Sequence, residues 1–306
     1  MEKIISVIKN PSRIGLKLLR MFGWMLSDRM FLKIQFRLKM GYPLNLDNPQ
    51  TYNEKLQWLK LYNRRPEYTN MVDKYEVKKY VASIIGEEHI IPTLGLWDRF
   101  EDIDFDQLPS QFVLKTTNGG GGGGVVVCKD KAKLDKKKTK RIIERSLRSN
   151  IYRGYKEWPY KNVKPRIIAE KYMEDESGEL RDYKFTCADG VAHNVMICFD
   201  RFTGDTKFYF FDREWNLLRL NKRGLAAPSD FSIEKPKRVE EMFDIAGRLS
   251  EKLPYARVDL YNVNGKIYFG EITFYPQSGY DSNLLEETDK LFSSYIKINI
   301  YKNKHK

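Results

Sequence analysis

A run of six consecutive glycines, at residues 119–124, constrains this chain more than any other part of its sequence. Short apolar segments flank the run: residues 112–114 lead into Lys115, and three valines follow the last glycine. Apolar β-formers on both sides of a glycine cluster predict two strands joined by a turn. Glycine lets backbone N–H groups converge on an anion, and it lets the backbone approach closely because it has no Cβ. Lys115 adds a positive charge beside the loop, so the pattern predicts a flexible flap over nucleotide phosphates.

Low-complexity linkers also contain glycine runs, and this is the main alternative interpretation. We favour the flap because linkers seldom join two short strands of one hairpin. Two familiar phosphate loops are excluded by the residues that follow the glycines. A Walker A loop needs Gly-Lys-Ser/Thr at the start of a helix, and a dinucleotide fold also needs a helix there. Here Val125 opens a β-branched run, which starts a helix poorly.

The net charge of +13 over 306 residues favours an anionic partner. Nucleotides, acidic glycans, membrane surfaces and nucleic acids all have this character. A nucleic-acid binder is disfavoured, because no aromatic residue is interleaved with the basic residues at 131–148, as a stacking platform would require. We expect that basic run to form a helix with a solvated, lysine-rich face.

Histidine and cysteine offer little for a metal site. The histidines are His89, His193 and His305, too few for a histidine-based metal site or a catalytic triad, and we interpret His193 as a core residue. The three cysteines lie in strand-like segments without metal-type spacing, which indicates buried thiols in a reducing compartment. No apolar run approaches the ~20 residues that span a bilayer. No signal peptide with a small-residue cleavage site is visible, so we expect a cytoplasmic protein.

Residues 1–40 are basic and amphipathic. Their pattern fits a helix that contacts an anionic membrane through residues 1–28, on the inner membrane face, and equally fits a helix packed on the protein's own core. Further on, Thr51 and Glu54 have the spacing of a capping box and predict a helix through Leu59.

Periodicity predicts a mixed set of elements, which places the chain in the α+β class. The expected helices cover residues 71–85, 131–148, 240–253 and 284–300. The expected strands begin near residue 91 and then cover 167–172, 183–187, 191–199 and 207–211, with turns at 189–190 and 203–205. A last pair of strands covers 256–262 and 266–274.

This last strand pair contains two carboxylates, Asp259 and Glu271, among apolar residues. A buried carboxylate is unfavourable without a cation, so both need partners. A two-residue turn at 264–265 would place them on opposite faces of the hairpin, since side chains alternate with period two. A three-residue turn at 263–265 places Arg257, Asp259, Glu271 and Thr273 on one face, and we therefore predict the three-residue turn.

Two carboxylates on one wall are typical of a Mg²⁺ site in which substrate phosphates supply further ligands. The alternative is a structural ion pair between Arg257 and Glu271. The glycine flap elsewhere in the chain favours the metal site.

The motifs together resemble a known family. A strand lysine before a glycine-rich flap, a later Glu-Lys-aromatic run, and R-x-D followed by a G-E-x-x strand are similar to the ATP-grasp superfamily. The segments DKYEVKKYV, IPTLGLWD, FVLK, DYKF, RVDLYNVNGKIYFGEITFYP and TYNEKLQWLKLY resemble its TupA-like family. That family is named for teichuronopeptide biosynthesis and occurs in gene clusters for cell-surface polysaccharides, including capsule. The resemblance extends from about Tyr42 to Tyr280.

The resemblance implies an ATP-grasp fold, in which two α+β subdomains grip ATP. It divides the chain into a basic, largely helical region at 1–65 and an ATP-grasp domain at 66–300. Within that domain it implies a flap subdomain at about 92–168 and a metal-binding core subdomain at 169–300.

The resemblance also implies the activity, an ATP- and Mg²⁺-dependent carboxylate–amine ligase that works through an acyl phosphate. The substrates would be an acidic glycan or amino-acid carboxylate and an amine, joined on a cell-surface polysaccharide precursor. A kinase on the same fold remains an alternative. So does a glycosyltransferase, for which the only support is the D-x-D-like run at 102–106, which we interpret as an acidic loop.

By position, the resemblance assigns roles to individual residues. Lys74 and Lys115 would hold ATP phosphates under the flap formed by Gly120, Gly121, Gly122 and Gly123. Glu170, Lys171 and Tyr172 would surround adenine, and Asp182 would meet the ribose. Asp259 and Glu271 would bind Mg²⁺, and Arg257 would stabilise the tetrahedral intermediate. Thr273 stands where many ATP-grasp ligases have asparagine, and its hydroxyl is a weaker metal ligand than an amide carbonyl.

Overall fold

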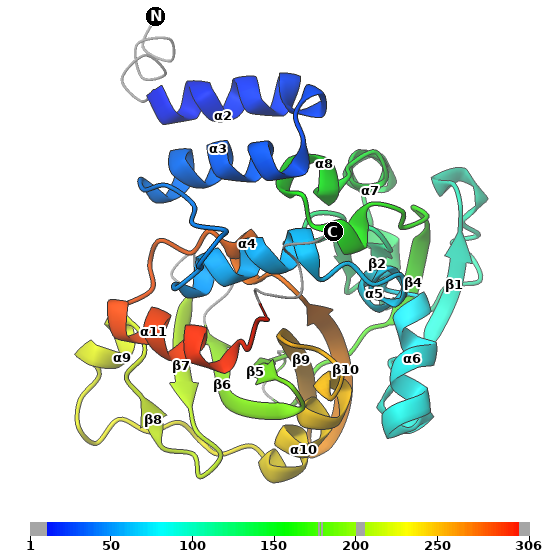
Figure 1. The fold of residues 1–306 in the computed structure, drawn as a ribbon. Coiled ribbons are helices and arrows are strands. Elements are labelled where there is room, and N and C mark those ends of the chain that lie inside the picture. The colour runs from blue at the N-terminus through cyan, green and yellow to red at the C-terminus, as the bar shows by residue number, and fades with distance from the viewer. Residues whose placement is uncertain (1–10, 177, 179, 200–205, 300–306) are drawn as a thin grey trace, which may run out of the picture.

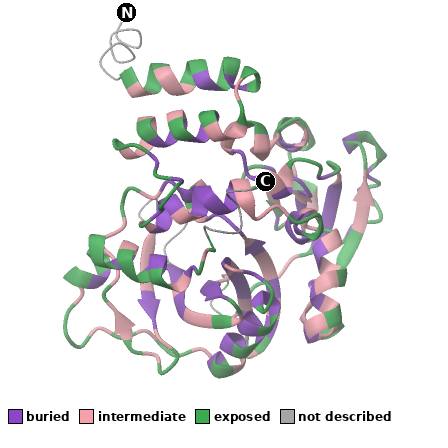
Figure 2. Cartoon of the chain, in the orientation of Figure 1, coloured by how far each residue is buried: buried purple, intermediate pink, exposed green. Residues whose placement is uncertain are grey.

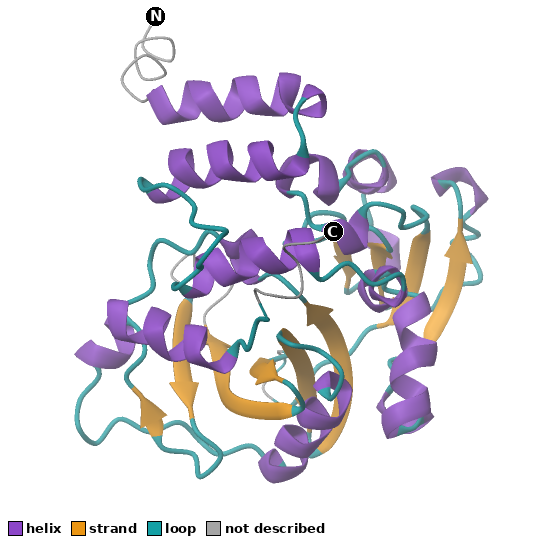
Figure 3. Cartoon of the chain, in the orientation of Figure 1, coloured by secondary structure: helices purple, strands orange, loops and turns teal. Residues whose placement is uncertain are grey.

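The protein combines helices with two antiparallel sheets, as the α+β prediction requires (Figure 1). We describe it from a computed structural model over residues 11–176, 178, 180–199 and 206–299. Helices surround both sheets, and the chain alternates between helical and sheet segments (Figure 3). No helix in these ranges has the length and apolar character needed to cross a bilayer.

The smaller sheet has the strand order β1-β4-β2-β3, and its pairs are antiparallel. Its strands are β1 (Thr93–Trp97), β2 (Phe112–Thr116), β3 (Val125–Cys128) and β4 (Ile167–Lys171). β2 and β3 form the hairpin around the glycine run, with Lys115 opposite Val125, which confirms the strand–turn–strand prediction. Helix α7 (Lys136–Leu147) packs against this hairpin, and Ile143 joins a core that includes Phe112 and Leu114. The predicted subdomain boundary at residue 168 falls within β4.

The larger sheet has the order β10-β9-β5-β6-β7-β8. Its strands are β5 (Asp182–Ala188), β6 (Val191–Phe199), β7 (Lys207–Phe211), β8 (Leu217–Leu218), β9 (Ala256–Val263) and β10 (Lys266–Thr273). The predicted meander β5-β6-β7 is confirmed, and its first turn uses Asp189 and Gly190 at φ 46° and 84°. The second predicted turn, at 203–205, lies outside the described residues. Helix α10 (Val239–Ser250) packs against this sheet, with the rings of Phe243 and Phe185 4.9 Å apart.

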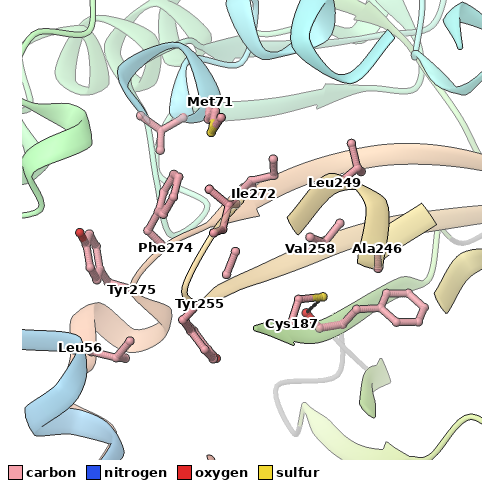
Figure 4. Packing of buried hydrophobic residues seen from close by; sticks show 14 of the residues in the cluster. Leu56, Met71, Cys187, Ala246, Leu249, Tyr255, Val258, Ile272, Phe274 and Tyr275 are labelled. Carbon is pink, nitrogen blue, oxygen red and sulfur yellow. Dashed lines mark hydrogen bonds between the residues drawn. The ribbon is translucent and has the colours of Figure 1, made fainter. Parts of the chain in front are cut away.

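A large hydrophobic core joins the bigger sheet to the helices around it (Figure 4). Leu249, Val258 and Ile272 meet there, and Tyr275 and Leu56 extend the core toward α4 (Tyr52–Tyr62). The predicted capping box at the start of α4 is present, since the Thr51 side chain accepts from the Glu54 N–H and Glu54 accepts from the Thr51 N–H. Burial of these apolar groups supplies most of the stabilisation of such a fold.

The three cysteines, Cys128, Cys187 and Cys198, are buried, as predicted. His193 is only partly buried and stacks on Tyr295 with ring centroids 3.7 Å apart, so it lies at the margin of the core.

Three helix predictions are wrong in their extent. The helix expected at 284–300 ends at Tyr295, and residues 296–299 are not helical. The segment 71–85 is not one helix, because α5 (Glu67–Val72) ends before α6 (Glu76–Ile85) begins. At the break, Asp73 Oδ1 accepts hydrogen bonds from the N–H groups of Tyr75 and Glu76, which offers the backbone a local alternative to helix. The basic run splits similarly into the 3-10 turn η4 (Lys131–Lys133) and α7, where Asp135 caps α7 through the Lys138 N–H.

The N-terminal helices form a layer outside the larger sheet. Helix α2 (Pro11–Phe22) and the 3-10 turn η1 (Gly23–Met25) lie outermost, and α3 (Asp28–Met40) lies between α2 and α4 in Figure 1. The other short elements are η2 (Glu87–His89), η3 (Phe100–Asp102), α8 (Ile151–Tyr155), η5 (Trp158–Tyr160), α9 (Lys222–Ala226), η6 (Pro276–Gly279) and α11 (Glu286–Tyr295).

The predicted turn between β9 and β10 is wrong. Val263 pairs with Lys266, so the turn has two residues, Asn264 and Gly265, both at positive φ as a type I′ turn requires. The pairing then slips at Gly270, a β-bulge that places Glu271 opposite Asp259. Because the bulge inserts one residue, it returns Glu271 to the face of Asp259. The predicted shared face is therefore present, by a different device.

Candidate active site

Strands from both sheets line a central cavity of about 470 Å³. β2 and β4 contribute Lys115 and Glu170 from the smaller sheet, and β5, β9 and β10 contribute side chains from the larger one. Predicted site residues that line it are Lys74, Lys115, Gly120, Gly121, Gly122, Gly123, Glu170, Asp182, Arg257, Asp259 and Glu271. The fold thus brings together groups that lie up to almost 200 positions apart in the chain.

The glycine loop forms one wall of this cavity. Gly121 and Gly122 have φ of 62° and 78°, a region that other residues rarely adopt, and a Cβ on either would meet no neighbouring atom within 4 Å. At Gly124, by contrast, a Cβ would collide with the Ser146 side chain. The loop is therefore anchored at its end and open at its tip, as a flap over a ligand requires.

A cluster of ammonium groups faces the loop. Glu170 forms ion pairs with Lys78 and Lys115, each with an Nζ–Oε distance of 2.6 Å. Burial alone would raise the pKa of Glu170, but the two lysines outweigh burial and hold its pKa below the ordinary value. Lys74 donates to the Gly119 carbonyl from the break between α5 and α6, and burial lowers its pKa. These lysines can pair with phosphate oxygens at the cavity.

Lys171 and Tyr172 lie outside the central cavity. They line a neighbouring cavity of about 230 Å³, whose walls combine Val113, Val127, Met173 and Leu180 with charged residues that include Lys129 and Arg181. Lys115 and Glu170 line both cavities, so the two spaces adjoin. The aliphatic side chains of this second cavity have the chemistry to hold a flat base next to its phosphates.

The opposite wall carries the predicted acidic pair. Arg257 donates to both oxygens of Asp259, at 2.6 and 2.8 Å, and to Glu271 Oε1 and Thr273 Oγ1, each at 3.2 Å. Lys184, on β5 opposite Asp259, adds a further ion pair to Asp259. Burial would raise the pKa of Asp259, but Arg257 and Lys184 outweigh burial and lower it. Thr273 shares this face but does not line the cavity.

A sequence model of the TupA-like ATP-grasp family matches residues 54–297, most of the chain. The chain belongs to the TupA-like ATP-grasp family. Its fold is accordingly the ATP-grasp fold, with helices and two antiparallel sheets. No curated protein sequence shows a significant match to this chain.

Solved structures give distant likenesses to this TupA-like protein. D-alanine–D-alanine ligase from Helicobacter pylori has 15% identity and a TM-score of 0.42, over 80% of this chain and 69% of that chain. The D-alanine–D-alanine ligase from Bacillus anthracis has 15% identity and a TM-score of 0.45, over 78% and 72%. The ATP-grasp ligase PsnB, solved with a precursor variant, Mg and ADP, has 12% identity and a TM-score of 0.43, over 92% and 73%.

The carboxylates in the cavity of this TupA-like protein fit a magnesium ion whose further ligands are phosphate oxygens. Within the described ranges, no group of three or more His, Cys, Asp and Glu side chains is placed to hold a metal. Asp259 and Glu271 would supply two carboxylates, which is the usual protein contribution when phosphates and water complete the octahedron of Mg²⁺. Arg257 and Lys184 keep the buried Asp259 carboxylate charged, as a metal ligand must be.

The sequence analysis missed two charged residues of the central cavity. Lys78 lies in α6, beyond the break that holds Lys74, and also donates to the Ile91 carbonyl at 2.7 Å. A second lysine four positions after Lys74 was the available signal. Lys184 is a charged residue within the buried strand β5, and a lysine in an apolar strand is itself a signal of a buried partner.

Proposed function

We propose that this protein is an ATP- and Mg²⁺-dependent ligase that joins a carboxylate to an amine through an acyl phosphate and releases ADP. The observation that carries the proposal is Arg257, which lies on the wall of the two carboxylates and lines the same cavity as the glycine loop. An arginine at this position can stabilise an oxyanion that forms on the acceptor. A protein that only binds a nucleotide would not require such a group.

The chemistry divides into two steps. An oxygen of the acceptor carboxylate attacks the γ-phosphorus of ATP, and the bond to the bridging oxygen breaks, so that ADP leaves with the electron pair. The amine then attacks the acyl carbon, loses a proton, and expels phosphate from the tetrahedral intermediate.

The chain's own residues have separate roles in these steps. Lys74, Lys78 and Lys115 bind and orient the phosphates, and the glycine loop closes over them to exclude water. Asp259 and Glu271 would hold Mg²⁺, which when bound would neutralise charge on the transferred phosphoryl group. Arg257 donates to the oxyanion of the tetrahedral intermediate. Thr273, as a partner of Arg257, helps to fix the guanidinium.

The family's association with surface glycans supports an acidic acceptor on a cell-surface polysaccharide precursor, built in the cytoplasm. The structure adds nothing in favour of a glycosyltransferase. In the D-x-D-like run, Asp102 pairs with Arg99 on the surface, and Asp104 Oδ1 accepts from the Asp106 N–H. These carboxylates do not line the central cavity.

A turnover screen tests the proposal. Acidic sugars and amino acids are offered with ATP, Mg²⁺ and an amine, and ADP release is scored. Hydroxylamine should trap the activated acid as a hydroxamate, and Glu271→Gln should abolish both signals. Glu286→Gln removes an exposed carboxylate elsewhere and should change neither. Arg257→Ala should lower turnover with ATP affinity little changed. AMP and pyrophosphate as products would contradict the acyl phosphate, and a phosphorylated hydroxyl would identify a kinase.

A further inference from the structure

A third cavity adjoins the central one at Lys184 and Arg257. This aromatic cavity, of about 230 Å³, has walls that include Tyr52, Phe208, Phe210, Tyr255 and Phe292, with Asn221, Asp281 and Asn283 as polar groups. Among the residues described, only Lys184 and Arg257 line both this cavity and the central one. An acceptor lying in the aromatic cavity would therefore meet these two cations on the side of the nucleotide.

The two cations share one carboxylate. Arg257 binds Asp259 through two hydrogen bonds, whereas Lys184 binds it through Oδ2 alone and lies 3.5 Å from Asp182 Oδ2. The Asp259 side chain is only 2% exposed. Because the fork of Arg257 remains on Asp259, the ammonium of Lys184 can leave Asp259 without depriving that carboxylate of a counter-ion. Its flexible four-carbon stem allows it to turn between the two cavities.

We propose that Lys184 is an internal counter-ion of Asp259 that a divalent cation displaces, and that the released ammonium then binds the acceptor carboxylate in the aromatic cavity. The inference rests on the proposed function. A metal ion on Asp259 repels the ammonium, since both are cations within a few ångströms in a poorly solvated site. Metal–nucleotide and acceptor therefore strengthen each other's binding by the same factor.

The first test measures how much Mg²⁺ is needed for ADP binding, by calorimetry at a series of Mg²⁺ concentrations. Lys184→Met removes the competing ammonium with little change in shape and should lower the Mg²⁺ concentration required for ADP binding about tenfold. The free energy that corresponds to this tenfold change is a small part of the Coulomb repulsion between two cations at such distances. Lys290→Met removes the same charge from an exposed helix position and should leave the requirement unchanged. An equal or higher requirement in Lys184→Met overturns the counter-ion role.

This outcome is distinct from a failure of the proposed function. If ADP binding by the unaltered protein does not depend on Mg²⁺, then the assignment of the metal site is wrong, and the proposed exchange at Asp259 is wrong as well. If the dependence is present but identical in Lys184→Met, only the role of Lys184 is wrong. Thermal melting of each variant shows that it is folded.

The second test uses benzoate, a small carboxylate whose ring suits aromatic walls, and follows its binding by saturation-transfer NMR. Mg²⁺ and ADP together should tighten benzoate binding about tenfold, within the usual range of coupling between two sites. In Lys184→Met the affinity should be the same with and without them. Benzoate binding that ignores Mg²⁺ and ADP in the unaltered protein overturns the exchange.

A separate surface carries a second proposal, which does not depend on the reaction. The outer face of α2 and η1 exposes Ile14, Leu18, Met21, Phe22, Trp24 and Met25, with Trp24 79% accessible. The inner face packs on α3 through Leu19 and Gly23. Figure 2 shows α2 as largely exposed, with the other described residues on one side of it. Among the described residues, one face of this helix is packed on the protein and the other is exposed.

The charges beside this apolar face select its partner. Arg13, Lys17 and Arg20 are exposed on α2, and no acidic residue occurs from position 11 to position 27. A second copy of the chain would bring the same cations together and repel. Anionic lipid headgroups complement them, while the apolar side chains enter the acyl boundary and the indole of Trp24 suits the interface. We infer that this face binds an anionic membrane surface.

Point substitutions test this better than deletion of residues 1–28, because Asp28 binds Arg64 and Tyr152 within the fold. The triple change Leu18→Ser, Met21→Ser and Phe22→Ser should reduce sedimentation with phosphatidylglycerol vesicles at least about tenfold, since each apolar side chain contributes on the order of 1 kcal/mol or more. Leu225→Ser changes an exposed leucine elsewhere and should bind normally.

Lipid composition and oligomeric state complete the test. Binding should be weak on neutral phosphatidylcholine vesicles and should fall with added salt. Equal binding to neutral vesicles, or none to anionic ones, overturns the inference. So does a dimer in size-exclusion chromatography that the triple change converts to a monomer, because the face would then be a contact between copies.

Discussion

Glu170 holds two lysine ammonium groups beside the central cavity, and its replacement by glutamine should destabilise the nucleotide-free protein while leaving ATP able to compensate. Both ion pairs are 2.6 Å long, and the side chains of Glu170, Lys78 and Lys115 are 7%, 14% and 19% exposed. Glu170→Gln preserves shape but leaves two largely buried ammonium groups facing each other without a carboxylate.

The expected loss follows from this geometry. Removal of one partner from a fully buried pair costs about 3–5 kcal/mol, whereas an exposed pair is worth about 0.2–1 kcal/mol. The lysines here can still reach solvent in the cavity, so we expect a loss of about 2–3 kcal/mol. For a chain of this size that corresponds to a decrease in Tm of about 3–5 °C.

ATP should reverse part of this loss. Its phosphate oxygens can replace the carboxylate as partners of Lys78 and Lys115, and in the variant they no longer compete with Glu170. Saturating ATP should therefore raise the Tm of Glu170→Gln by more than it raises that of the unaltered protein. A smaller increase would mean that Glu170 acts mainly on the adenine, as the family resemblance implies.

The pH dependence has a defined sign. The pKa of Glu170 in the folded protein lies below its ordinary value of 4.5, so this carboxylate contributes its full stabilisation above about pH 4.5. The contribution is lost as the pH falls through the lower, folded pKa. The difference in Tm between Glu170→Gln and the unaltered protein should thus be constant from pH 8 to pH 5 and shrink below pH 4.5.

Differential scanning fluorimetry with and without ATP measures all three effects. Glu286→Gln is a matched control, because Glu286 also pairs with a lysine at 2.6 Å but is 83% exposed, and its Tm should be unchanged. Equal Tm values for Glu170→Gln and the unaltered protein at pH 7 would refute the reasoning, since the two pairs would then contribute nothing net.

Three further predictions concern the cavity and the core. Lys115→Ala and Lys74→Ala should each weaken ATP binding about 10- to 100-fold in calorimetry, because each loses a charge-assisted contact worth ~1.5–3 kcal/mol. Unchanged ATP affinity in both variants would contradict the assignment of these lysines to phosphate binding. Changing Gly121 and Gly122 to valine should leave the melting curve nearly intact but slow the production of ADP, because β-branched residues avoid the positive φ of these positions. Normal turnover would indicate that the glycine run is a linker. Burial raises the pKa of the Cys187 thiol to about 12, so Ellman's reagent at pH 8 should label it only after unfolding.

Local patterns predicted much of this fold. The hairpin of β2 and β3, the meander of β5 to β7 and the capping box of α4 each depend on neighbouring residues or on a period of two. What could not be predicted came from tertiary context. The break at Asp73 interrupts an apolar helical pattern, and only the folded chain shows that it delivers Lys74 to the Gly119 carbonyl. Lys184 likewise acquires its meaning from the pairing of β5 with β9.

In the hairpin of β9 and β10, the predicted turn was wrong but the predicted shared face of Asp259 and Glu271 was correct. Either a three-residue turn or a bulge adds the single residue that places Glu271 on the same face as Asp259, and the alternation of polar and apolar residues cannot distinguish them. Two glycines could have decided the matter. Asn264-Gly265 is the dipeptide of a two-residue turn, and a glycine within a strand, here Gly270, often marks a bulge.

Gly270 is required at the bulge for a steric reason. A Cβ there would lie 2.9 Å from the Asp259 carbonyl oxygen and 3.1 Å from the Tyr261 ring. Gly270 precedes Glu271 and closely approaches the backbone of Asp259, so the bulge sets the register of the two carboxylates within the sheet rather than through the loop. The turn at Asn264 lies several residues farther along the hairpin, and its conformation does not enter the geometry of that site. The chain therefore separates the residue that closes the hairpin from the residue that aligns the carboxylates.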